Sequence, residues 1–173
     1  SKVAHSCHPN TSYSSKTDDG CLEYKAIRPI ATGEMITFSY LDKVCETPTH
    51  IRRSKLQQSK SFLCRCEKCM APDYARPLRC RKCHGTIMGT DDGGGGETTW
   101  VCDGCGTVSN IETFMMAEIE IESRLASQEQ MMMAALAMVQ PSEFKREITI
   151  ASKKLHPLHY LVLQAMTMHV RLC

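Results

Sequence analysis

The pattern of apolar and polar residues divides the chain into a first part of short alternating segments and a last part of longer helical stripes. Residues 21–30 and 35–40 alternate with a period of two, which is typical of half-buried β-strands. Beyond residue 111, apolar side chains recur every three to four positions and predict amphipathic helices. The three helical stripes consist of Phe114, Ala117, Ile121 and Leu125; then Phe144, Ile148, Ala151 and Leu155; then Leu158, Leu161, Val162, Ala165 and Leu172. The pattern predicts an α+β protein with a helical C-terminal region.

Two shorter signals complete this outline. Thr49 can cap a short helix that runs through residues 51–56, with Pro48 just outside it. Residues 98–101 predict a short strand that returns from a glycine-rich tip. Methionine-rich residues 131–139 either continue the first helix or form another.

Composition limits the classes of function. Apolar residues make up 42% of the 173 residues, which is enough for a core, and no apolar run approaches the roughly 18 residues of a membrane span. The formal charge of +2 falls to about −2 if eight cysteines hold two zinc ions, since each four-thiolate site contributes about −2. We therefore expect neither a membrane protein nor a direct nucleic-acid binder, although the basic stretch 51–84 leaves the latter as an alternative.

Cysteine spacing carries the strongest chemical signal. Three of the eleven cysteines, Cys64, Cys66 and Cys69, lie within six residues, so a tetrahedral zinc site there needs one ligand from a distant segment. Two further pairs, Cys80 with Cys83 and Cys102 with Cys105, form a self-sufficient set with the spacing of a zinc ribbon. This grouping favours metal in a reducing compartment over a disulfide scaffold. We expect the nucleus, the cytoplasm or both.

Four motifs in order resemble the C-terminal half of a SET domain followed by its cysteine-rich post-SET segment. They are residues 5–10 (HSCHPN), 33–42 (GEMITFSYLD), 52–53 (RR) and 62–69 (FLCRCEKC). Within that superfamily the chain most resembles the SET-and-MYND lysine methyltransferases. Residues 155–160 (LHPLHY) resemble, more loosely, the tetratricopeptide-like C-terminal region of the same family.

The resemblance implies a fold and a domain organisation. Residues 1–69 would be half of a SET domain with its pseudoknot and post-SET cluster, residues 70–110 a zinc-ribbon insertion, and residues 111–173 the helical region. Cys7 would supply the missing thiolate to Cys64, Cys66 and Cys69. Both zinc sites would be structural, because four thiolates leave no open position.

The resemblance also implies an activity, namely methyl transfer from S-adenosylmethionine to a lysine of a protein substrate. Tyr40 would be the catalytic tyrosine, and Ala4, His5, Tyr40 and Phe62 would contact the cofactor. Without the resemblance, Tyr40 is more simply a core aromatic at a strand end, and His5 a hydrogen-bonded loop histidine.

Several features depart from the family pattern. Ala4 replaces an asparagine, Lys60 replaces a second channel aromatic, and the N-terminal half of SET is absent from this sequence. We therefore expect a fragment that is inactive alone, from a parent that is an enzyme. The alternative is a non-catalytic, zinc-stabilised interaction scaffold, with a protein partner on the helical tail.

Overall fold

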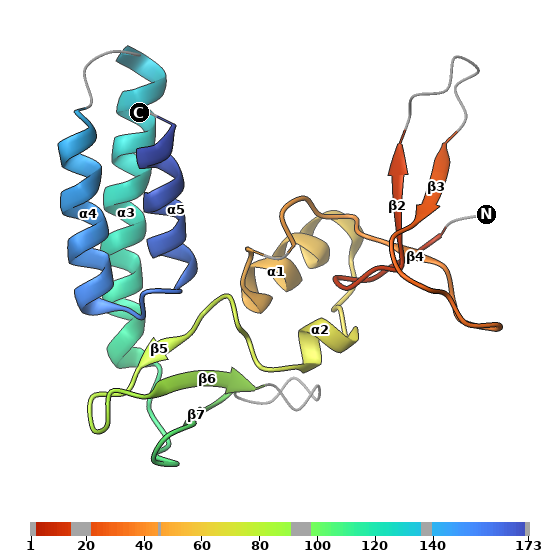
Figure 1. The fold of residues 1–173 in the computed structure, drawn as a ribbon, viewed down its shortest axis with the longest axis horizontal. Coiled ribbons are helices and arrows are strands. Elements are labelled where there is room, and N and C mark those ends of the chain that lie inside the picture. The colour runs from red at the N-terminus through yellow and green to blue at the C-terminus, as the bar shows by residue number, and fades with distance from the viewer. Residues whose placement is uncertain (1–2, 15–21, 45, 91–97, 136–139, 172–173) are drawn as a thin grey trace. The chain divides into compact units, whose positions relative to one another are not determined.

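The structure is a computed structural model that describes residues 3–14, 22–44, 46–90, 98–135 and 140–171 (Figure 1). These residues form two compact units, one within residues 1–72 and the other formed by residues 73–90 with 98–171. Helices and strands are both present, as the α+β prediction requires. None of the described helices is long and apolar enough to cross a membrane.

The first unit combines short strands with two helices. Strand β1 (Ala4–His5) pairs in parallel with β4 (Thr37–Phe38), and β2 (Thr11–Ser14) pairs antiparallel with β3 (Glu23–Ala26). Helices α1 (Thr49–Lys60) and α2 (Glu67–Met70) follow. The parallel β1–β4 pair brings the first described residues beside a segment more than thirty positions later, which is the contact that assembles the site below.

The second unit begins with a three-stranded antiparallel sheet. Its strands are β5 (Leu78–Arg79), β6 (Thr86–Thr90) and β7 (Thr99–Cys102), in that order. Burial alternates along β6 and β7, with Ile87 and Trp100 turned inward. The Trp100 ring packs so closely on Gly89 that a Cβ there would lie 2.9 Å from the ring atom Cζ2, so glycine is needed at this position.

Three antiparallel helices complete the second unit (Figure 1). They are α3 (Glu112–Ala135), α4 (Pro141–Lys154) and α5 (Tyr160–Val170). Phe144, Leu155 and Leu161, all no more than 1% exposed, belong to the same core cluster as the ribbon residues Ile87 and Trp100. The ribbon and the helices, which the sequence placed in separate regions, therefore share one hydrophobic core.

The helical stripes are confirmed in α3 and α4 and, except at Leu158, in the described part of the last stripe. Phe114, Ile121 and Leu125 of α3 are buried, and so are Phe144 and Ala151 of α4. Leu158 is exposed, so the buried part of the last stripe starts at Leu161 and continues with Val162 and Ala165. The prediction for Leu172 lies outside the described residues.

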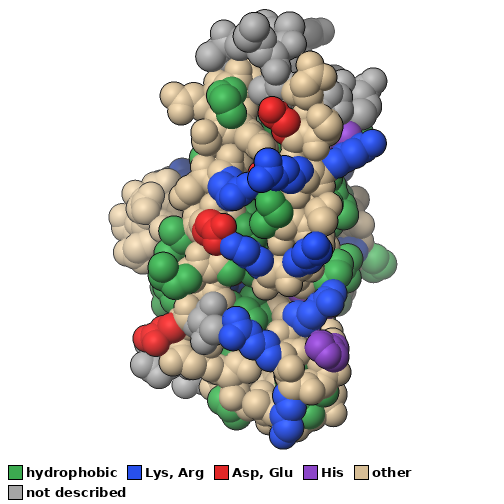
Figure 2. All heavy atoms as spheres, turned by 90° about the vertical axis from the view of Figure 1, so that its left-hand side faces the viewer, with side chains coloured by type: hydrophobic (Ala, Val, Ile, Leu, Met, Phe, Trp, Pro, Cys, Tyr) green, Lys and Arg blue, Asp and Glu red, His purple; other side chains and the backbone are tan. Residues whose placement is uncertain are grey.

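The side of α4 opposite its buried stripe is charged. Lys145, Arg146 and Lys153 are exposed there, and Figure 2 shows Lys and Arg side chains gathered on this face of the second unit. Because charged side chains keep their hydration at such a surface, α4 is amphipathic in the ordinary sense.

Two local predictions were wrong in detail. Pro48 rather than Thr49 is the N-cap of α1, no side chain caps the helix, and Thr49 is its first residue. The strand predicted over residues 35–40 is paired only at Thr37 and Phe38, while Met35 and Ile36 are exposed.

Candidate functional site

The first cysteine cluster joins the beginning of the first unit to its end. The sulfurs of Cys7, Cys64, Cys66 and Cys69 lie within 4.8 Å of one another, although 57 residues separate Cys7 from Cys64. Cys7 Sγ is 4.0 Å from Cys64 Sγ and 3.6 Å from Cys69 Sγ. Four sulfurs at the Zn–S distance of about 2.3 Å from one ion would lie roughly 3.8 Å apart, whereas a disulfide needs about 2.05 Å. The cluster therefore fits a zinc ion and could bind one.

Two arginines of α1 hold the thiol-bearing segment in place. Arg52 is 1% exposed and donates to Cys69 Sγ at 3.5 Å and to the Lys68 carbonyl at 3.4 Å. Arg53 donates to the carbonyls of Cys64 at 3.1 Å and Cys69 at 3.2 Å. A guanidinium beside thiolates offsets part of their negative charge, and such outer contacts orient metal ligands.

The second cysteine cluster is local and more exposed. The sulfurs of Cys80, Cys83, Cys102 and Cys105 also lie within 4.8 Å of one another, with Cys80–Cys105 at 3.8 Å and Cys83–Cys102 at 3.4 Å. The Gly85 amide donates to Cys83 Sγ at 3.4 Å. This set also fits tetrahedral zinc, and four protein ligands again leave no position for a reactive water.

His5 connects the first cysteine cluster to Tyr40. Its Nδ1 accepts a hydrogen bond from the Tyr40 backbone amide at 3.0 Å. Burial lowers the pKa of His5 below its ordinary value, which favours the neutral ring. The single ring proton is then assigned to Nε2, which lies 3.2 Å from Cys7 Sγ and can donate to a thiolate there. One imidazole thus fixes the position of a candidate metal ligand and of the candidate catalytic residue.

Two aromatic rings lie beside this imidazole, and a third packs on one of them. The His5 ring lies 5.0 Å from the Tyr40 ring and 5.8 Å from the Phe62 ring, and Phe38 lies 4.9 Å from Tyr40. The Tyr40 hydroxyl donates to the Val3 carbonyl at 2.7 Å. Aromatic faces attract cations, so this set is chemically suited to a sulfonium or an alkylammonium group. We call His5, Phe38, Tyr40 and Phe62 the aromatic cluster.

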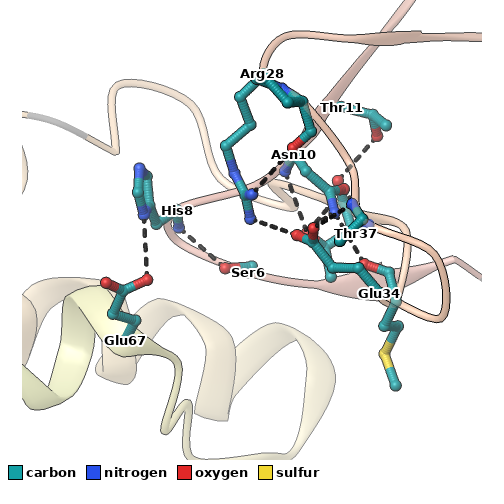
Figure 3. A network of polar contacts seen from close by, with 11 residues as sticks. Ser6, His8, Asn10, Thr11, Arg28, Glu34, Thr37 and Glu67 are labelled. Carbon is teal, nitrogen blue, oxygen red and sulfur yellow. Dashed lines mark hydrogen bonds and ion pairs between the residues drawn. The ribbon is translucent and has the colours of Figure 1, made fainter.

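Asn10 fixes the path of the chain just beyond Cys7 (Figure 3). Its side chain donates to Glu34 Oε1 and to the Met35 carbonyl, both at 2.9 Å, and accepts from the Thr37 amide at 2.8 Å. Asn10 is fully buried, and Arg28 pairs with Glu34 at 2.8 Å. Because every polar atom of the Asn10 amide has a partner, the network fixes the register of the parallel β1–β4 pair.

The structure brings most of the predicted residues together. Cys7 lies with Cys64, Cys66 and Cys69, the second set of four cysteines also converges, and His5, Tyr40 and Phe62 are neighbours. Ala4 lies in β1 opposite Thr37, where its methyl group offers no polar contact. The predicted role of each residue in catalysis or cofactor binding stays a prediction.

Sequence reasoning did not assign roles to Arg52, Arg53 or Asn10. All three lie within the motifs quoted above, so their positions in the sequence could have marked them as candidates. What was missing was the knowledge that Arg52 is buried against a cysteine more than a dozen residues away.

Comparison with known proteins gives a family for the first part of the chain. Residues 1–41 match the SET domain family. The chain is 39% identical over 69 residues to the human "Protein-lysine N-trimethyltransferase SMYD5" and 37% identical over 71 residues to the "Histone-lysine N-methyltransferase SET5" of Meyerozyma guilliermondii. It is 35% identical over 74 residues to a SET and MYND domain-containing protein of Dictyostelium discoideum.

These matches are partial on both sides. They cover 39%, 40% and 43% of this chain and 16%, 14% and 14% of the three relatives, in the same order. The SET domain match and these relatives support a SET/SMYD-like family for the matched first part of the chain, and two of the three relatives carry names of lysine methyltransferases.

Proposed function

We propose that the first unit is part of the active site of an S-adenosylmethionine-dependent protein-lysine N-methyltransferase. The observation that carries the proposal is the position of His5, which contacts both Tyr40 and Cys7 within the aromatic cluster. A zinc ion at the first cysteine cluster would stabilise this arrangement without taking part in the reaction.

The residues would divide the work as follows. S-adenosylmethionine, when bound, supplies a methyl group on a sulfonium cation, and the rings of Phe62 and Tyr40 can face that positive charge. The Tyr40 hydroxyl, now on the Val3 carbonyl, would orient the substrate amine. The amine must be neutral to attack, and a partly dry channel favours that state because desolvation lowers the pKa of a lysine.

The fold prediction extends the proposal. We infer that the β1–β4 crossing belongs to the SET pseudoknot, and that α3–α5 begin a tetratricopeptide-like region that offers a surface to a protein partner. Both inferences rest on the family resemblance.

The test compares this chain with the longest natural form of the protein that contains it. We expect the long form to bind S-adenosylmethionine and to transfer labelled methyl groups to lysines of added proteins, while the chain alone does neither. Tyr40→Phe in the long form should lower kcat by about 100-fold, the scale for removing one oriented hydrogen-bond donor. Tyr74→Phe is the matched control, because Tyr74 is exposed and belongs to no part of the site.

A second candidate function has specific support. Ala4 offers only a methyl group where a polar contact to cofactor is expected, and Lys60 places a cation beside Tyr40. Both features suit a scaffold that no longer methylates. Absence of cofactor binding by the long form at saturating S-adenosylmethionine would favour the scaffold over the enzyme.

A further inference from the structure

The ammonium group of Lys60 lies on an aromatic ring of the candidate active site. Lys60 Nζ is 5.7 Å from the centroid of the Tyr40 ring, within the range of a cation–π contact. Among the described residues, no carboxylate lies within ion-pair distance of Lys60 Nζ. The contact that this ammonium group makes is therefore with the ring face of Tyr40.

The backbone directs Lys60 toward this ring. Lys60 is the last residue of α1, and the next residue, Ser61, adopts the left-handed conformation with φ of 58°. That reversal lets the residues on both sides of Ser61 reach the aromatic cluster, Lys60 at Tyr40 and Phe62 at His5. Fully buried Leu56, one turn earlier, packs in the same cluster as Tyr40 and Phe62 and anchors the helix end.

A substrate lysine carries the same alkylammonium group as Lys60. One face of one ring holds one such cation, since two would repel each other at contact distance. We propose that Lys60 occupies, in the resting protein, the ring face of Tyr40 on which the substrate lysine first arrives as an ammonium ion, and that Lys60 competes with it there before that lysine loses its proton for the transfer step. This inference rests on the proposed function, because it takes Tyr40 to be where the substrate lysine arrives.

The size of the effect follows from the exposure of the contact. A cation–π contact at an exposed site corresponds to roughly a 2- to 5-fold change in an equilibrium constant. Lys60 would thus lower the affinity of every alkylammonium ligand of this ring face by the same small factor, without blocking the site.

The experiment uses three variants of the chain and a small probe. Lys60→Met removes the charge and keeps an unbranched side chain that is one atom shorter, while Lys60→Arg keeps a cation that can stack on the ring. Lys55→Met is the control, because Lys55 is exposed on the same helix. The probe is Nα-acetyl-lysine N-methylamide, titrated while the Tyr40 ring resonances are followed by NMR. The Lys60 ε-methylene shift is recorded in the unliganded protein.

Three results are expected. The Lys60 ε-methylene protons should be shifted upfield by the Tyr40 ring current relative to those of Lys55. Lys60→Met should bind the probe about 2- to 5-fold more tightly than the unaltered chain. Lys60→Arg and Lys55→Met should leave the probe affinity within 1.5-fold, by roughly the same scale.

The outcomes separate this inference from the proposed function. Equal ε-methylene shifts for Lys60 and Lys55, or unchanged probe affinity in Lys60→Met, would overturn the inference even if the long form methylates lysines. Tighter probe binding by Lys60→Met in this chain, together with absence of methyl transfer by the long form, would support the ammonium site and remove the enzymatic function.

Discussion

The two cysteine clusters have the same donor atoms but organise the chain in different ways. In the first cluster, Cys7 meets Cys69 across 62 residues, and three of the four cysteines are buried. In the second, the closest pairs are 19 and 25 residues apart, and Cys83 and Cys105 are exposed. Closing a longer loop costs more chain entropy, so a metal ion at the first cluster imposes the greater constraint on the unfolded chain.

The first cluster therefore connects distant segments of the chain, whereas the second stabilises a local structure. The first cluster brings Cys7, which follows β1, to the cysteines near the end of the first unit, and His5 connects Cys7 to Tyr40. The second cluster shapes the ends of the ribbon strands, whose core is continuous with the helices. Disrupting the two clusters should therefore have unequal consequences.

The largest expected effect is that of breaking the first cluster. The intact chain should contain about two zinc ions, one for each four-cysteine site. Cys66→Ser should lose one and unfold the first unit, because a structural zinc contributes on the order of 10 kcal/mol to folding. Metal analysis would measure the loss of zinc, and amide hydrogen exchange of residues 37–40 would measure the unfolding of the first unit.

Cys105→Ser is the matched comparison in the second cluster. It should also lose one zinc but leave the exchange protection of residues 37–40 unchanged. Retained protection in Cys66→Ser, or a single zinc in the intact chain, would contradict the division of roles between the clusters.

A smaller effect is expected at a buried ion pair that organises the second unit without metal. Glu118 accepts from Arg76 Nε at 2.6 Å and lies 2.9 Å from Nε2 of fully buried His159. Burial alone would raise the pKa of Glu118, but the hydrogen bonds from Arg76 and His159 lower it to about 2. The folded-state pKa is thus below the ordinary value of 4.5, so the stabilisation is complete above pH 4.5 and is lost as the pH falls toward 2.

Glu118→Gln tests this pair. The lowering of the Glu118 pKa corresponds to about 3 kcal/mol. The free energy of unfolding of the variant should therefore be lower by about that amount at pH 7, and the difference should shrink below pH 4.5. Urea unfolding followed by the fluorescence of Trp100, the single tryptophan, would measure the difference. Zinc release at low pH is common to both proteins and cancels. Exposed Glu129→Gln is the control, and a deficit that stays constant down to pH 3 would contradict the assignment.

The smallest of the three effects is expected at Asn10. Asn10→Ala leaves Glu34, the Met35 carbonyl and the Thr37 amide without their buried partner, which should cost about 2 kcal/mol. Zinc content should stay at the value of the intact chain. Faster amide exchange at Thr37 would measure the loss, with exposed Ser12→Ala as control. Unchanged exchange would mean that the metal cluster alone fixes the first unit.

The predictable part of this protein is the part whose signals are local. The ribbon cysteines stand in two CxxC pairs, and the stripes of α3 and α4 follow helical periodicity, so a window of a few turns contains all that is needed. The packing of the ribbon on these helices was not predicted, because neither the cysteine spacing nor the helical periodicity shows which two surfaces will pack together.

The sequence by itself determined the donor atoms, the helical faces and, through four ordered motifs, the family resemblance. Only the tertiary structure decided that His5 contacts both Cys7 and Tyr40, that Arg52 is buried against Cys69, and that Lys60 lies over the Tyr40 ring. These contacts join residues as much as 35 positions apart in one small volume. Their geometry depends on the pairing of β1 with β4 and on the direction of the chain at the end of α1, and no local propensity specifies either of them.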